Sequence, residues 1–210
     1  VFLPTGIPAG TPFTIQVTAT SLNGNGILGN ADATDQHYSL VAYNFSEQAV
    51  PPVNKNSDFD GDGKADVSVF RPSNGTWYLT NSNNGAFVGS QFGANGDLIA
   101  PGDYDGDGKT DYAVFRPSSG AWYIMRSQLG FTAAQFGTSG DLPAQGDFDG
   151  DNKTDISVFR PSSGAWYRLN SSNGQFVAVQ FGLNGDKPVQ GDYDGDGRSD
   201  ISVFRESSGA

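Results

Sequence analysis

The chain has 210 residues, with 23 acidic residues against 12 basic ones, one histidine, no cysteine and a formal net charge of −11. This acidity argues against a nucleic-acid binder, which needs a basic face, and the missing cysteine excludes disulfides, thiolate nucleophiles and cysteine-ligated zinc. A content of 12% aromatic residues excludes a disordered acidic tail, and no apolar run approaches the roughly 20 residues of a membrane span.

Residues 1–48 are predicted to form a β-strand segment. Apolar and polar residues alternate within residues 11–21 and 37–45, and a connection rich in glycine and asparagine joins these stretches. We expect Asp32 and Asp35 to be ordinary loop acids rather than parts of a fifth cation site. His37, the one histidine, is expected to be a surface or strand-capping residue.

From residue 49 onward the sequence repeats with a period of 44 or 45 residues. Trp77, Trp122 and Trp166 follow this period, as do three Gln-Phe-Gly triplets. Units of this size bury their apolar faces against their neighbours, so we expect Trp122, Tyr123 and Phe136 to lie between sheets. The repeats are predicted at about residues 49–93, 94–137, 138–182 and 183–210, the last one partial.

Each repeat is predicted to contain four short strands. In the second repeat they cover residues 98–102, 111–116, 121–126 and 131–136, and turns that contain glycine separate them. In the first repeat, Val67 and Val69 alternate with Ser68, which predicts a strand with one buried face. Four strands in about 45 residues match one blade of a β-propeller. The predicted fold is therefore all-β, with three complete propeller-type blades and a partial fourth.

A loop with the pattern Asp-x-Asp-Gly-Asp-Gly-x-x-Asp lies between the first and second predicted strands of each repeat, with asparagine in place of the second glycine in the third loop. Sixteen of the 23 acidic residues belong to these four loops, so the negative charge is a local feature repeated four times. Glycine at the sixth position suits a turn with positive φ, and Asn152, which replaces it in the third loop, is the residue that tolerates this conformation best after glycine.

Alternate aspartates on a curled loop bring carboxylates to one point, where they repel each other unless a cation neutralises them. Hard oxygen ligands in a flexible loop favour Ca²⁺, whereas zinc would need histidine or cysteine. We expect side-chain ligands at loop positions 1, 3, 5 and 9 and a backbone carbonyl at position 7, with about four Ca²⁺ bound; solvated acidic turns are the alternative. The predicted metal ligands are Asp58, Asp60, Asp62, Lys64, Asp66, Asp103, Asp105, Asp107, Lys109, Asp111, Asp147, Asp149, Asp151, Lys153, Asp155, Asp192, Asp194, Asp196, Arg198 and Asp200.

The loop is similar to the first half of an EF-hand, but valine stands at position 12 in place of the bidentate glutamate. The Asp-Tyr-Asp-Gly-Asp-Gly run at residues 103–108, with Asp111, Ala-Val-Phe at 113–115 and Gln-Phe-Gly at 135–137, resembles the FG-GAP/VCBS repeats of integrin α-subunits and many secreted bacterial proteins. This resemblance covers about residues 49–210. It implies a β-propeller, metal ligands at the aspartates, and adhesive or scaffolding roles. Propellers of the family usually have about seven blades, which leaves ring closure open.

Residues 31–44 resemble the last strands of the β-sandwich that follows the catalytic domain in some secreted subtilisin-like proteases. This implies that residues 1–48 are the end of a β-sandwich domain. We therefore expect the chain to be a fragment of a larger secreted protein.

No residues form a recognisable catalytic constellation, so the chain is not expected to be an enzyme. Arginine recurs after the second predicted strand and aspartate before the first. Two readings of the arginines remain open: ion pairs with these aspartates, or stems that cover neighbouring aromatic rings. The residues concerned are Arg71, Arg116, Arg160 and Arg205, with Asp97, Asp141 and Asp186.

Together these features predict a non-catalytic Ca²⁺-binding repeat module of a secreted or cell-surface bacterial protein, which serves adhesion, binding or scaffolding. Its partner would be a protein or glycan ligand, with no nucleic acid and no membrane span. One alternative is a protomer of an extracellular filament that is completed by strand pairing at the open edge of the fourth repeat. Others are a closed four-bladed ring completed by residues 11–21 and 37–45, and an accessory C-terminal region of a secreted hydrolase such as a protease.

Overall fold

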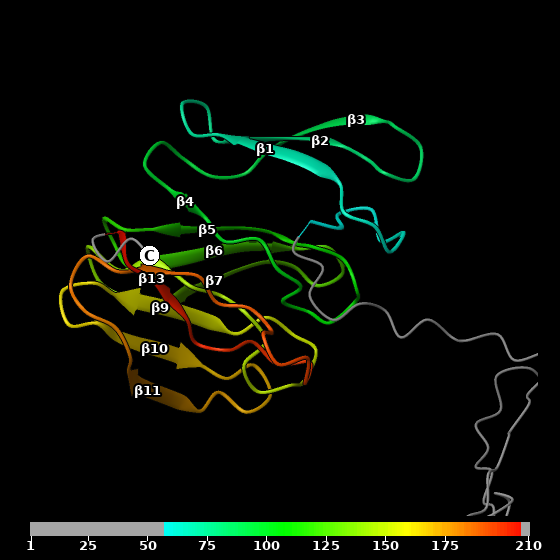
Figure 1. Cartoon of the computed structure of the whole chain (residues 1–210). Helices are drawn as coiled ribbons and strands as arrows, with labels where there is room; N and C mark the ends of the chain where they lie inside the picture. The colour runs from blue at the N-terminus through cyan, green and yellow to red at the C-terminus, as the bar shows by residue number, and fades with distance from the viewer. Residues whose placement is uncertain (1–56, 207–210) are drawn as a thin grey trace, which may run out of the picture. The chain divides into compact units, whose positions relative to one another are not determined.

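A computed structural model describes residues 57–206 of the chain (Figure 1). The chain divides into two units between Glu47 and Gln48, and the described residues all belong to the second unit. The predicted β-sandwich segment, the predicted boundary after residue 48, and Asp32, Asp35 and His37 lie outside the described residues.

The described residues form four successive antiparallel sheets and contain no α-helix, which confirms the predicted all-β, blade-type fold (Figure 1). The first sheet contains β1 (Val67–Arg71), β2 (Thr76–Thr80) and β3 (Phe87–Gln91). The second contains β4 (Leu98–Ile99), β5 (Tyr112–Arg116), β6 (Ala121–Arg126) and β7 (Gly130–Gln135). The third contains β8 (Leu142–Pro143), β9 (Ile156–Arg160), β10 (Ala165–Leu169) and β11 (Phe176–Gln180), and the fourth contains β12 (Lys187–Pro188) and β13 (Val203–Phe204).

In the second and third sheets the strands are paired in chain order, from the first strand of the repeat to the fourth. The first strand is shorter than predicted: β4 ends at Ile99, and beyond it the pairing continues as a backbone bond from Ala100 to Ala113 and an isolated bridge between Gly102 and Asp111. The third and fourth repeats have the same interruption, with Gln145 and Gln190 at the position of Pro101, so it is a feature of the repeat and not of one residue. The acidic loop therefore begins just after a short first strand whose end is held by the bridge between Gly102 and Asp111.

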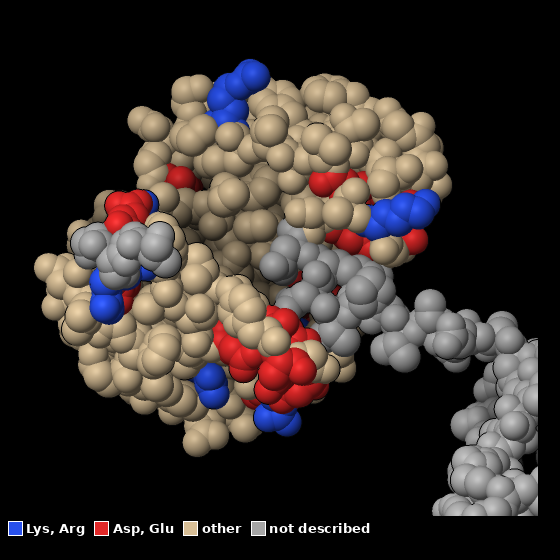
Figure 2. Space-filling model, in the orientation of Figure 1, with Lys and Arg blue, Asp and Glu red and all other residues tan. Residues whose placement is uncertain are grey.

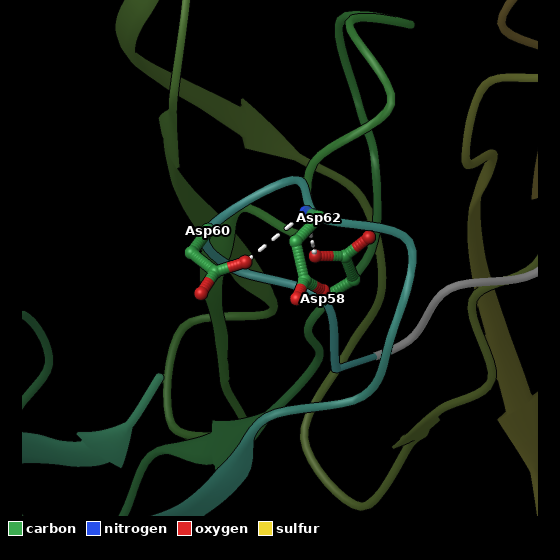
Figure 3. A group of neighbouring side chains, drawn as sticks. All are labelled: Asp58, Asp60 and Asp62. Carbon is green, nitrogen blue, oxygen red and sulfur yellow. Dashed lines mark hydrogen bonds between the residues drawn. The ribbon is translucent and has the colours of Figure 1, made fainter. Parts of the chain in front are cut away.

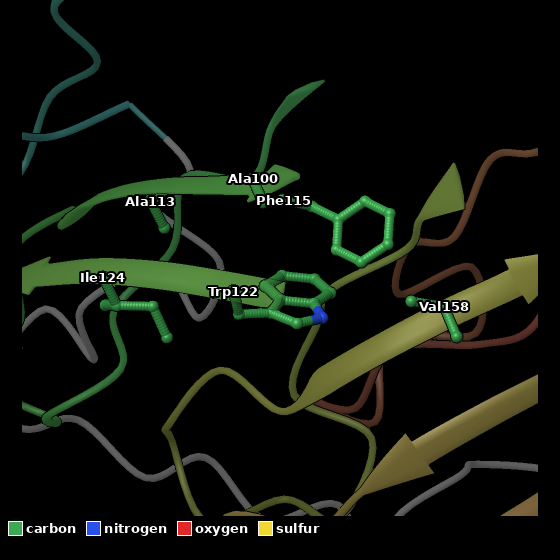
Figure 4. Packing of buried hydrophobic residues seen from close by; sticks show 6 residues of the cluster. All are labelled: Ala100, Ala113, Phe115, Trp122, Ile124 and Val158. Atoms are coloured by element: carbon green, nitrogen blue, oxygen red, sulfur yellow. The ribbon is translucent and has the colours of Figure 1, made fainter. Parts of the chain in front are cut away.

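The core lies within the sheets and between them. Trp122 and Phe115 are fully buried, and their rings meet at 5.4 Å between centroids (Figure 4). The indole Nε1–H of Trp122 donates to the backbone oxygen of Phe136 at 2.8 Å, so β6 is fixed to the end of β7. Val158, which comes from the third sheet, belongs to the same cluster, as the stacked-repeat prediction required.

One prediction about the first sheet is wrong. Val67 and Val69 were expected to face a core, but they are 75% and 59% exposed. The residues equivalent to Val69 in the second and third repeats are Val114 and Val158, and both are fully buried. The reason is that this valine packs against the preceding repeat, and no described repeat precedes the first sheet.

Both proposed roles of the recurring arginines are confirmed for the second and third repeats. Arg116 is bonded to Asp97 through two nitrogens and lies over the ring of Tyr123, and Arg160 does the same with Asp141 and Tyr167. Each pair connects the turn before the first strand with the end of the second. It thereby fixes the strand that leads into the acidic loop.

Candidate metal centres

Each acidic loop curls around the aspartate at its first position. In the second loop, Asp103 accepts hydrogen bonds from the backbone N–H groups of Gly106 and Gly108, at 2.6 and 2.8 Å. Both glycines have positive φ, as the tight curl requires. Asn152 has φ 65° at the equivalent of Gly108, so the prediction that asparagine would adopt this conformation is confirmed.

The curl brings three carboxylates together in each loop, with one oxygen of each within 4.8 Å of the others. In the first loop these are positions 1, 3 and 5, namely Asp58, Asp60 and Asp62 (Figure 3). In the other loops they are positions 1, 3 and 9, namely Asp103, Asp105 and Asp111; Asp147, Asp149 and Asp155; and Asp192, Asp194 and Asp200. These clusters could hold metal ions. On the face shown in Figure 2, acidic side chains likewise gather in separate patches with basic side chains beside them.

The predicted ligands at position 5 of the second, third and fourth loops, Asp107, Asp151 and Asp196, lie outside these groups. Asp107 Oδ1 accepts the N–H of Lys109 and its Oδ2 accepts the hydroxyl of Ser127. Asp151 has the same partners in Lys153 and Ser171. These serines follow the third strand of their repeats, and sequence reasoning missed them. The repeat period could have revealed them, because Ser82, Ser127 and Ser171 have the same spacing as the three tryptophans.

Position 9 fixes the loop to the rest of the blade. Asp111 Oδ2 accepts the N–H of Tyr104 at 2.8 Å, and its Oδ1 accepts the N–H of Ser127 at 2.7 Å. In the first loop, Asp66 makes the equivalent bonds with Phe59 and Ser82, and it is not part of the three-carboxylate group there. This aspartate therefore joins the start of the loop to the turn between the third and fourth strands.

Asp105 carries the strongest sign of a missing positive partner. Its Oδ2 accepts the N–H groups of Gln128 and Leu129, at 3.0 and 2.9 Å. Its Oδ1 is buried, and among the described side chains it is the buried polar atom found without a hydrogen-bond partner. An unpaired buried carboxylate oxygen is costly. A cation bound between Asp103, Asp105 and Asp111 would pair it, so the residues present fit a metal ion.

Several aspartates of the loops have raised pKa values. Burial, together with the neighbouring Asp105 and Asp103 carboxylates, raises the pKa of Asp111 to about 6, although hydrogen bonds from the backbone of Tyr104 and Ser127 lower it. Burial likewise raises the pKa values of Asp103, Asp147 and Asp155. A raised pKa means that the environment disfavours the charged carboxylate. A bound cation would reverse this preference.

Position 7 has a second role that the sequence did not reveal. The Lys109 side chain lies along the first loop, where a Cβ placed on Gly61 would be 2.8 Å from Lys109 Cε. Lys153 lies over Gly106 in the same way, and Arg198 over Gly150. In the second, third and fourth repeats the basic side chain therefore covers the acidic loop of the preceding repeat. The predicted backbone carbonyl ligand at this position remains a prediction.

Comparison with known protein families matches the FG-GAP-like repeat to residues 58–114 and 147–203. The chain belongs to the FG-GAP-like repeat family. The two matches begin at Asp58 and Asp147, the first positions of the first and third loops, and each covers two successive acidic loops with the strands between them. FG-GAP repeats are generally non-catalytic modules and are typical of extracellular proteins.

Searches of curated proteins and of solved structures gave no significant match. Among residues 57–206 there is no helix long and apolar enough to cross a membrane.

Proposed function

We propose that the four acidic loops of this FG-GAP-like repeat protein bind Ca²⁺, and that the protein is a non-catalytic module of a secreted or cell-surface bacterial protein. The observation that carries the proposal is the buried, unpaired Oδ1 of Asp105 in a group of three carboxylates. Solvated acidic turns would leave no such oxygen, because water would reach it.

The size of the groups supports calcium. Ca²⁺ binds oxygen at about 2.3–2.6 Å, so two ligand oxygens of one ion can be at most about 5 Å apart. The carboxylate oxygens of each group lie within 4.8 Å of one another. Aspartate oxygens are hard ligands, and the chain has no cysteine and one histidine, which leaves little for zinc. Calcium also takes 6–8 oxygens, so backbone carbonyls and water would complete each site.

The proposed role of the ions is structural. Each loop joins the first two strands of a blade, and position 9 fixes it to the turn beyond the third strand. A cation in the loop would neutralise carboxylates whose charge the fold disfavours, and its binding free energy would add to the stability of the folded state. Extracellular calcium is abundant enough to fill sites of roughly millimolar affinity.

Calorimetric titration and thermal melting test the calcium proposal. We expect heat of binding, and a melting temperature that rises with free Ca²⁺ and falls in EGTA. Asp105→Asn should remove one of the sites, whereas Glu206→Gln, which neutralises an acid outside the loops, should leave the titration unchanged. No heat of binding together with a melting temperature unaffected by EGTA would overturn the proposal.

We further propose that the blades present a surface for adhesion to a protein or glycan ligand, in keeping with the non-catalytic nature of the family. Exposed aromatic side chains recur on the fourth strands of the blades, at Phe87, Phe131 and Phe176. Aromatic rings at such positions supply contact area for a ligand. A glycan array probed with the calcium-loaded protein tests the glycan form of this proposal, and the triple substitution of these residues by serine should abolish any signal.

A further inference from the structure

The first and second acidic loops are hydrogen-bonded to each other. The N–H of Thr110, at position 8 of the second loop, donates to the backbone oxygen of Asp58, at position 1 of the first, at 2.7 Å. In return, the N–H of Asp58 donates to the Thr110 hydroxyl at 2.9 Å. Both residues are buried, so separating the loops would take buried polar groups away from these partners, which is unfavourable.

The next two pairs of loops are connected in the same way. The N–H of Thr154 in the third loop donates to the backbone oxygen of Asp103 in the second at 2.6 Å. The N–H of Ser199 in the fourth loop donates to the backbone oxygen of Asp147 in the third at the same distance. Position 8 of one loop is therefore bonded to position 1 of the preceding loop in every pair of successive loops among the described residues.

These two positions are next to, or are themselves, candidate metal ligands. Position 1 belongs to the three-carboxylate group of every loop, and position 9 belongs to it in the second, third and fourth loops. Position 8 directly precedes position 9. Asp58 of the first group and Asp111 of the second are thus joined through one residue, Thr110. A movement of the backbone at one candidate site therefore reaches the next.

Hydrogen bonds within each loop complete the connection. The N–H of Asp111 donates at 2.7 Å to the backbone oxygen of Gly102, the residue before Asp103. The third and fourth loops have the equivalent bond, at 2.8 and 2.6 Å. Bonds between loops and bonds within loops therefore alternate from the first loop to the fourth. A loop that changes its curl must move backbone to which its neighbour is bonded.

The curl of a loop depends in turn on a cation. Three carboxylates face one another in each loop, and the buried Oδ1 of Asp105 has no hydrogen-bond partner. Both features disfavour the curled loop until a positive charge is bound. The bonds between loops need the curled backbone on both sides. An ion that holds one loop in this form therefore also favours it in the neighbouring loop.

On the basis of the calcium binding proposed above, we propose that Thr110, Thr154 and Ser199 couple the acidic loops, so that an ion in one loop raises the calcium affinity of the neighbouring loops. These residues are positioning residues: each holds the first ligand of the preceding loop and precedes the last ligand of its own. Such coupling is reciprocal between two sites. The loops would then fill over a narrower range of free Ca²⁺ than independent sites would.

A calcium titration of the ¹⁵N-labelled whole chain, followed by NMR, resolves the loops. Each loop has a glycine whose N–H donates to its own first aspartate, namely Gly61, Gly106, Gly150 and Gly195. In the wild type their resonances should shift together, with a Hill coefficient above one.

Emptying the second loop tests the coupling to the first. Asp105→Asn should abolish the response of Gly106 and raise the dissociation constant read at Gly61 about fivefold, the lower end of typical couplings. Asp149→Asn is the matched control, because it removes the same charge from the third loop, which has no printed bond to the first. Its effect at Gly61 should be much smaller. In roughly 1 M KCl, where charges act over only about 3 Å, the fivefold effect should persist.

Thr110→Val tests the route. Valine keeps the shape of threonine and the backbone bond but removes the hydroxyl that accepts the Asp58 N–H. With one of the two bonds gone, the effect of Asp105→Asn at Gly61 should fall from about fivefold to about twofold. Thr110→Ser, which keeps the hydroxyl, should retain the full effect. Thr110→Ala replaces the valine variant if that variant loses its far-UV circular dichroism signal.

The outcomes separate this proposal from calcium binding itself. Glycine resonances that do not respond to Ca²⁺ would overturn both. If they respond but Asp105→Asn leaves the affinity at Gly61 unchanged or tightens it, the loops are independent or their ions repel, and the coupling is disproved while calcium binding stands. A full fivefold effect in Thr110→Val, or its disappearance in high salt, would show that the hydrogen bonds do not carry the coupling and would equally refute the proposal.

Discussion

The guanidinium of Arg116 donates two hydrogen bonds to the carboxylate of Asp97, at 2.7 and 2.9 Å, while it lies 4.4 Å from the ring centroid of Tyr123. Asp97 is buried, and this arginine is its ionic partner. In the first repeat Arg71 also lies over a ring, that of Tyr78, but the position equivalent to Asp97 is Pro52.

This difference between repeats isolates the value of the carboxylate bond. Arg116→Lys loses the two hydrogen bonds to the Asp97 carboxylate and the stacking, whereas Arg71→Lys loses the stacking and a hydrogen bond to the Tyr78 hydroxyl but no bond to an equivalent carboxylate. We expect Arg116→Lys to lower the free energy of unfolding by about 1–3 kcal/mol more than Arg71→Lys does. Urea denaturation of the two variants measures this difference, and equal effects would contradict it.

Most of the blade could be predicted from the sequence, because its signals are local. The period, the glycine turns and the strand alternation placed β5, β6 and β7 within one residue of their bounds. The contacts between repeats could not be predicted in this way. Thr154 and Ser199 read as ordinary polar loop residues, and their backbone bonds to the preceding loop depend on how the sheets stack. The exposure of Val69 was missed for the same reason.

In the candidate site, too, the local features could be predicted from the sequence and the contacts between distant positions could not. The aspartates and the conformation of Asn152 follow from the loop pattern. The bonds of Asp107 to Ser127 do not, since they join positions 20 residues apart through the fold of the blade.

Gly102 offers a test of the junction between the second and third repeats. A Cβ at this position would lie 2.5 Å from Thr154 Oγ1, and threonine is stiff, so Gly102→Ala forces the two repeats apart. We expect a loss of about 1–3 kcal/mol in the free energy of unfolding. Gly191→Ala is the matched control, because the nearest atom there is 3.6 Å away, in Tyr193. Chemical denaturation should show almost no effect of the control.

Asn152 tests the backbone conformation of the third loop. Its φ of 65° is left-handed, a region that costs most L-residues about 1–2 kcal/mol. Asn152→Ala should therefore destabilise the metal-free protein by roughly 1 kcal/mol, whereas Asn152→Gly, the residue found in the other loops, should be close to neutral. Thermal melting in EGTA compares the three proteins. A glycine variant as unstable as the alanine variant would disprove the explanation.

Asp186 predicts a dependence on pH. The hydrogen bond from the Arg205 side chain lowers the pKa of Asp186 below its ordinary value. A lowered pKa in the folded state gives stability that is present above the unfolded value of about 3.9 and is lost as the pH falls through the folded value. The stability difference between wild type and Asp186→Asn should therefore be constant near neutral pH and shrink below about pH 4. Urea denaturation at several pH values checks this, and a difference that grows in acid would contradict it.

Each acidic loop is joined to the next one by a backbone hydrogen bond. These bonds run from Thr110 to Asp58, from Thr154 to Asp103 and from Ser199 to Asp147. A row of units that touch only their neighbours opens from its free ends, because an end unit breaks one junction and an inner unit breaks two. Amide protons of β6 and β10 should thus exchange with solvent more slowly than those of β2. A protease should trim the array from its outer repeats inward, and the middle blades should survive as the resistant fragment.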